Sequence, residues 1–139
     1  MSGDLAAARQ LLDAQGYTCV LCRGDIVHTT TLRGVRPLLQ WLESGVDVRG
    51  FSAADKVVGK ATAFLYCLLG VREVYAHVMS RIALETLQAQ GIDARYGQLV
   101  PHIINRAGDG FCPFEGAVEH ISDASEALKA IHKKMEQML

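Results

Sequence analysis

The sequence has no excess of charge of either sign and no long hydrophobic run. Its 139 residues carry 14 Lys and Arg against 15 Asp and Glu, for a formal net charge of −1. A chain so close to neutral has no general electrostatic attraction to nucleic acid or to an anionic membrane, so we predict neither partner. No apolar stretch reaches the length of a membrane span, and the N-terminus lacks the basic-then-apolar order of a secretory signal. These absences favour a cytoplasmic protein.

Signature motifs of common enzyme classes are also missing. The chain contains no Gly-x-Ser-x-Gly motif, no Walker-type loop and no dinucleotide fingerprint. Its five histidines form no close pair of the kind that binds zinc, so we predict no metal and no cofactor. Cys19 and Cys22 have the spacing of a metal or redox pair, but residues three apart on a strand point to opposite faces. We expect all four cysteines to be reduced in the cytoplasm.

Half of the residues are hydrophobic and 21% are charged, which is typical of one globular domain spanning residues 1–139. Periodicity and turn signals predict an alternation of helices and strands. They predict helices over Asp4–Gln15, from Pro37, over Arg81–Gln90, from Pro113 and after Ser122. They also predict a hairpin around Arg23-Gly24-Asp25, and strands over Val71–Met79 and Ile92–Val100. The last two strands flank a helix and are expected to be parallel, giving an α/β fold with a four-stranded mixed sheet.

The stretch Ser52–Gly70 is predicted to be one central helix. Ser52 and Asp55 have the spacing of a capping box, and Gly70 has the place of a left-handed helix end. Lys56 and Lys60 would then lie one turn apart near the positive end of the helix dipole, where they repel each other. An anion bound at the helix N-terminus would relieve this conflict. The alternative is that both lysines are simply solvated and Asp55 only closes the capping box.

A second stretch with unusual chemistry runs from Asn105 to Glu115. Gly108 and Gly110 allow positive φ and close approach of the backbone to a ligand. Pro113 suits the first position of a helix, which makes Cys112 its N-cap and places Glu115 as capping support. A thiol that faces free amides has the environment of a reactive cysteine. No general base is identifiable beside it, so an ordinary turn that uses cysteine is the alternative.

Three motifs, in order along the chain, carry a resemblance to a known family. They are Arg33-Gly34-x-x-Pro37-Leu38, Ala54-Asp55-Lys56-Val-Val-Gly59-Lys60-Ala61, and Pro101-x-Ile-x-Asn105-Arg106-x-Gly108-x-Gly110-x-Cys112-Pro113-x-Glu115. Together they resemble a family of small bacterial proteins classed as a domain of unknown function. The resemblance implies the cytidine-deaminase-like fold, a three-layer sandwich with helices on both faces of a four-stranded mixed sheet. It implies no activity, because the family has none established.

The same resemblance allows a comparison with zinc deaminases, whose central helix begins with His (or Cys)-Ala-Glu and whose next unit begins with Pro-Cys-x-x-Cys. The first place reads Ala53-Ala54-Asp55 here, and the second reads Met79–Leu84 without a cysteine. All three metal ligands are missing from these positions. Asp55 has the place of the general acid/base, but zinc-dependent deamination is not expected.

Our leading hypothesis is a protein that binds a small anionic ligand, such as a nucleotide, at the N-terminus of the central helix. Two alternatives stay open: an enzyme or redox protein that uses Cys112, with Asp55 as the second catalytic candidate, and a structural or partner-binding module without a ligand. Whether the protein is an enzyme is left open, and a homodimer is compatible with a broad sheet. The predicted ligand-binding residues are Ser52, Lys56, Lys60, Asn105, Arg106, Gly108 and Gly110.

Overall fold

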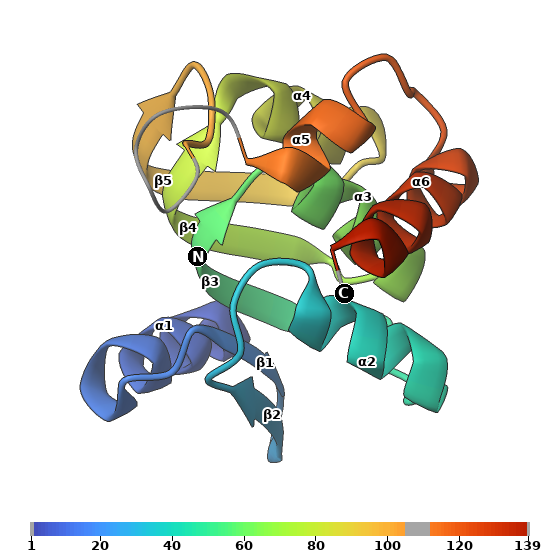
Figure 1. Cartoon of the computed structure of the whole chain (residues 1–139). Helices are drawn as coiled ribbons and strands as arrows, with labels where there is room; N and C mark the ends of the chain where they lie inside the picture. The colour runs from blue at the N-terminus through green and yellow to red at the C-terminus, as the bar shows by residue number, and fades with distance from the viewer. Residues whose placement is uncertain (1, 105–111, 139) are drawn as a thin grey trace.

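The computed structural model describes residues 2–104 and 112–138. Its strands are β1 (Cys19–Arg23), β2 (Ile26–Thr30), β3 (Ser52–Val58), β4 (Glu73–Ser80) and β5 (Asp93–Val100). Its helices are α1 (Gly3–Gln15), α2 (Arg36–Ser44), α3 (Lys60–Leu69), α4 (Arg81–Ala89), α5 (Pro113–Ala117) and α6 (Ala124–Gln137). Figure 1 shows these elements gathered around one sheet.

The sheet has five strands in the order β2-β1-β3-β4-β5. β1 runs antiparallel to both of its neighbours, whereas β3, β4 and β5 are parallel to one another. The α/β architecture with a mixed sheet is therefore confirmed, but the predicted number of four strands is wrong. The additional strand is β3, which lies at the centre of the sheet.

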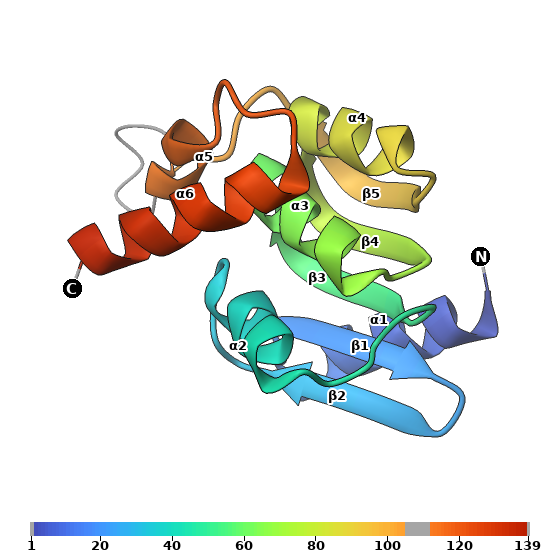
Figure 2. The same cartoon turned by 90° about the vertical axis from the view of Figure 1, so that its right-hand side faces the viewer.

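Helices cover the two faces of the sheet unequally. α1 packs on one face against β1 and β3, over a small core that contains Leu5, Val20 and Tyr75. The other face carries the larger core, in which α3 is central and contacts α2, α4 and α6. Figure 2 shows α1 behind the sheet while α2, α3 and α6 lie in front of it. The larger core holds the N-terminal end of α3 against the sheet, and the candidate site lies there.

Most predicted elements are confirmed. The hairpin turns between Arg23 and Ile26, and β4 and β5 are parallel with α4 between them. Ser80 caps α4 as predicted, because its Oγ accepts the amide hydrogen of Ala83 at 3.2 Å. Cys19 belongs to the larger core and Cys22 to the α1 core, so the two thiols lie on opposite faces of the sheet.

The prediction of a single helix over Ser52–Gly70 is wrong. Residues 52–58 form β3, and α3 begins only at Lys60, after the extended residue Gly59. β3 pairs with β1 on one side and β4 on the other, and this pairing outweighs the local helical signals of its alanines. The spacing of Ser52 and Asp55 only imitates a capping box. The predicted end of the helix is confirmed, because Gly70 adopts a left-handed conformation with φ of 76°.

Candidate functional site

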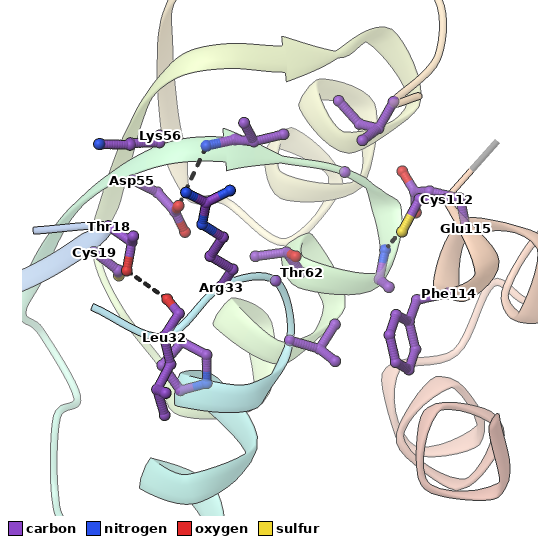
Figure 3. Close-up of a pocket in the computed structure, with 17 residues that line it drawn as sticks. Thr18, Cys19, Leu32, Arg33, Asp55, Lys56, Thr62, Cys112, Phe114 and Glu115 are labelled. Carbon is purple, nitrogen blue, oxygen red and sulfur yellow. Dashed lines mark hydrogen bonds between the residues drawn. The ribbon is translucent and has the colours of Figure 1, made fainter. Parts of the chain in front are cut away.

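A cavity of about 260 Å³ lies at the carboxyl end of β3, between the segment that precedes α2 and the short helix α5. In Figure 3 Thr18, Asp55 and Lys56 lie on one side of it, Cys112, Phe114 and Glu115 lie on the other, and Arg33 extends between them. Apolar side chains complete the walls. They include Leu32, Val35, Pro37, Val57 and Ile103. The cavity thus combines apolar walls with a few polar groups, as small-molecule sites do.

Asp55 is a buried acidic residue of this pocket, with only 7% of the residue exposed. It pairs across the sheet with Cys19, which brings the thiol beside it. The Tyr66 hydroxyl of α3 donates to Asp55 Oδ2 at 2.7 Å and lies 3.0 Å from Cys19 Sγ. The Val57 amide donates to Asp55 Oδ1 at the longer distance of 3.3 Å. One strand pair and one helix therefore hold the carboxyl group in place.

Burial sets the electrostatics of this group. Desolvation raises the pKa of Asp55 to about 6, although the hydrogen bonds from Tyr66 and the Val57 amide act in the opposite direction. Desolvation and the neighbouring Asp55 charge raise the pKa of Cys19 and of Tyr66 well above their usual values. At neutral pH the thiol and the phenol are therefore protonated, and Asp55 is the group that titrates.

Arg33 and Lys56 supply positive charge at the same pocket. Both residues line the cavity, and both are exposed to solvent. Within residues 2–104 and 112–138, neither of them forms an ion pair. Two exposed cations without an ion-pair partner among the described residues, at the edge of a concave site, favour the approach of an anion.

The N-terminus of α3 is already occupied by a carboxylate of the chain itself. Glu115 accepts hydrogen bonds from the amides of Lys60 at 2.8 Å and Ala61 at 3.0 Å. Glu115 was predicted to support the start of its own helix, and that prediction is wrong because it caps α3 instead. A negative charge at this end of a helix is stabilised by the free amides and by the helix dipole. The anion that the sequence analysis expected at the helix end is supplied by Glu115.

The predicted site residues fall into four groups. Asp55, Lys56 and Cys112 are brought together around the one cavity. Lys60 lines a neighbouring cavity of about 210 Å³, and its Nζ donates to the Glu119 carbonyl oxygen at 3.0 Å. Ser52 is fully buried, donates to Glu73 and does not line either cavity. The remaining predicted residues lie outside the described part of the chain. These are Asn105, Arg106, Gly108 and Gly110.

Three residues of the site were not predicted from the sequence: Arg33, Thr18 and Tyr66. Arg33 belongs to the Arg33-Gly34 motif, which was noted without a role, so a signal for it existed. Thr18 comes directly before β1, where its Oγ1 donates to the Leu32 carbonyl oxygen and ties the two segments together. In the sequence Tyr66 looks like an ordinary core residue. Its role depends on a hydrogen bond to Asp55, which lies on a different element, and no local pattern indicates that contact.

Cys112 is the N-cap residue of α5, as predicted, but its side chain makes no capping hydrogen bond. Its thiol is partly exposed beside the cavity, whereas Cys19 and Cys22 are 1% and 2% exposed. Cys67 is partly exposed too, but desolvation raises its pKa to about 11, which leaves little thiolate at neutral pH. We therefore expect iodoacetamide at pH 7.5 to alkylate Cys112 before the other three thiols. Peptide mass spectrometry after short exposures measures this order, and faster labelling of Cys67 or Cys19 contradicts it.

The described residues lack two structural features. Within this part of the chain, no three His, Cys, Asp or Glu side chains are grouped so that they could hold a metal ion. None of its helices is long and apolar enough to cross a membrane.

The fold and the site define a compact α/β protein with a small pocket at the end of its central strand. The chain belongs to the family of the Domain of unknown function (DUF1893), whose family model matches residues 7–135. The predicted membership of a family of unknown function is thus confirmed. Comparison with curated proteins gave no significant match.

Two solved structures are similar to this chain. The crystal structure of a DUF1893 family protein (TM1506) from Thermotoga maritima has a TM-score of 0.87 and 24% sequence identity, over 96% of this chain and 92% of that chain. It supports the fold. A diaminohydroxyphosphoribosylaminopyrimidine deaminase/5-amino-6-(5-phosphoribosylamino)uracil reductase from Thermotoga maritima has a TM-score of 0.43 and 16% identity, over 68% of this chain and 35% of that chain. That likeness is too weak to carry an argument, so the cytidine-deaminase-like fold stays a prediction.

Proposed function

We propose that the pocket at the end of β3 binds a small anionic ligand, with Arg33 and Lys56 contacting the anionic group. The observation that carries the proposal is the pair of exposed cations at a preformed cavity, neither of which has an ion-pair partner among the described residues. Holding two like charges beside one cavity costs free energy, and a bound anion removes that cost.

The position and lining of the cavity support the same proposal. It lies at the carboxyl end of β3, and ligands of open α/β sheets bind outside the carboxyl ends of parallel strands. Leu32 and Phe114 offer apolar surface for the body of a ligand, while Thr18 and Thr62 offer hydroxyl groups. A phosphate or carboxylate attached to a partly apolar body, as in a nucleotide, fits this combination.

The proposed site differs from the one that the sequence suggested. The anion contacts the side chains of Arg33 and Lys56 rather than the amides of the α3 N-terminus. Those amides already bind the Glu115 carboxylate, and an incoming anion would have to displace it and overcome its repulsion. Lys60 is accordingly removed from the proposed ligand contacts, because its ammonium group reaches the Glu119 carbonyl oxygen.

A ligand screen by thermal shift and calorimetry tests this proposal. Phosphate, nucleotides and nucleotide sugars are each added to the wild-type protein and to the Arg33→Ala/Lys56→Ala variant. We expect at least one of them to raise the melting temperature of the wild type, and to bind the variant at least tenfold more weakly, since each charge-assisted contact contributes more than about 1 kcal/mol.

The matched control is the Arg36→Ala/Lys133→Ala variant. It removes the same charge from two exposed residues that do not line the cavity. Equal losses of affinity in the two double variants would mean that only net charge matters. That result, or a screen in which no compound binds the wild type, would reject the proposed site.

A further inference from the structure

The hydrogen-bond chain at the base of the pocket has a fixed direction when Asp55 is ionised. The Tyr66 hydroxyl has one proton, which it donates to Asp55 Oδ2 at 2.7 Å. The contact of 3.0 Å between Tyr66 and Cys19 must then use the thiol proton, so that the thiol donates to the phenol oxygen. The chain runs from Cys19 through Tyr66 to Asp55 and ends in an acceptor.

The last acceptor of this chain lines the pocket, and Tyr66 is its one short hydrogen-bond donor among the described residues. Each carboxylate oxygen accepts about two hydrogen bonds. Besides the Tyr66 hydroxyl, the carboxylate has the Val57 amide at 3.3 Å, beyond the usual range of 2.7–3.2 Å for a strong N–H···O bond. The Lys56 amide and the Cys19 thiol lower its pKa by still less. Asp55 lines the cavity although only 7% of the residue is exposed. A buried carboxylate held by such weak hydrogen bonds is stabilised by a stronger donor from a ligand, and most by a donor that carries positive charge.

The two ends of the pocket therefore favour ligand groups of opposite kinds. Arg33 and Lys56 offer positive charge to an anionic group, and Asp55 offers an acceptor to a hydrogen-bond donor. We propose that the pocket selects anionic ligands that also carry an N–H donor, either an ammonium group or the N–H of a heterocycle, and that Asp55 receives this donor. This inference rests on the proposed function and adds to it the class of ligand.

Matched pairs of small molecules test the inference without any substitution in the protein. The first pair is 2-aminoethanesulfonate and ethanesulfonate, which differ in the ammonium group and share a sulfonate that stays ionised between pH 5 and pH 8. The second pair is adenosine monophosphate and ribose 5-phosphate, which differ in the adenine base, whose exocyclic amino group supplies the N–H donor. We expect the nitrogen-bearing member of at least one pair to bind about tenfold more tightly, as measured by calorimetry at pH 7.5. The pair that discriminates identifies the source of the N–H donor.

The Asp55→Asn variant shows whether Asp55 is the acceptor. In this variant the preference for the nitrogen-bearing member of each pair over its matched compound should disappear. Equal binding within both pairs in the wild type overturns the inference and leaves the proposed anion site standing. A preference that persists unchanged in the variant also overturns it. If none of the four compounds binds the wild type, the proposed anion site itself is rejected, and the inference that rests on it is rejected with it.

A pH series gives a second measurement on the wild-type protein. Protonation of Asp55 removes its charge, so the preference for 2-aminoethanesulfonate over ethanesulfonate should shrink as the pH is lowered from 8 to 5. The other titratable or charged groups near Asp55 are Cys19, Tyr66, Arg33, Lys56, Cys112 and Glu115. The Asp55→Asn variant separates the effect of these groups from that of Asp55. Any pH dependence of the preference that the other groups cause remains when Asp55 is replaced. An equal pH dependence in both proteins contradicts the role of Asp55.

Discussion

Replacing Gly59 with alanine is expected to lower the free energy of unfolding by about 2 kcal/mol, although alanine can adopt the backbone conformation found there. A Cβ added at Gly59 would lie 2.0 Å from Glu115 Oε1, so the carboxylate would have to leave. Its departure breaks the hydrogen bonds to the amides of Lys60 and Ala61 and uncaps the central helix. Urea denaturation at pH 7 measures the loss.

A double-mutant cycle identifies the cause of this loss. Glu115→Ala removes the same two hydrogen bonds directly and should cost a similar amount. Because both substitutions break one interaction, the Gly59→Ala/Glu115→Ala variant should be less stable than the worse single variant by no more than about 0.5 kcal/mol. Gly116→Ala is a suitable control, since a Cβ at Gly116 has no atom within 4 Å. Losses that simply add up would show that Gly59 and Glu115 act independently, contrary to the structure.

Replacing Asp55 with asparagine is expected to change how stability depends on pH. The pKa of Asp55 is about 6 in the folded protein against 3.8 as its ordinary value. The folded state therefore holds this proton more tightly than the unfolded state does. The resulting stabilisation is fully present below about pH 4 and is lost as the pH rises to about 6 and above. It amounts to about 3 kcal/mol, since each unit of pKa difference corresponds to about 1.4 kcal/mol.

Asparagine cannot titrate but retains an oxygen that accepts the Tyr66 proton. The stability of Asp55→Asn relative to the wild type should therefore increase by about 3 kcal/mol between pH 4 and pH 7. Urea denaturation at several pH values measures this difference, and Asp25→Asn in the exposed hairpin turn serves as the control. Parallel pH curves for Asp55→Asn and the wild type would show that Asp55 is not the buried titrating group.

The elements with strong local signals were predicted correctly from the sequence. The hairpin around Gly24, the cap at Ser80 and the helix end at Gly70 each depend on residues close together in the chain. β3 was missed because its conformation depends on partners far away in the sequence, namely β1 and β4. A central strand made of Ala53, Ala54 and their neighbours has no alternation of polar and apolar residues, since it is buried on both faces.

The candidate site, like the fold, was predicted only in part from the sequence. Asp55, Lys56 and Cys112 were selected for the types of their side chains, and the structure places all three around one cavity. The contact of Glu115 with the amides of α3 could not be predicted, because 55 positions separate it from Lys60. The same holds for Tyr66, which reaches Asp55 through the packing of α3 on the sheet, and for Cys19, which reaches it through the pairing of β1 with β3. The sequence thus indicated which residues carry chemistry, whereas only the fold shows which of them meet.

The central claim is that an anion binds at Arg33 and Lys56 and leaves the Glu115 cap of α3 in place. An NMR titration of the ¹⁵N-labelled protein with inorganic phosphate and with adenosine monophosphate tests it most directly. The account predicts saturable shifts for the backbone amides of Arg33, Lys56 and Val57, and unchanged signals for the amides of Lys60 and Ala61, which stay bonded to Glu115. Large shifts at Lys60 and Ala61, or no saturable shift at the cavity, would contradict it.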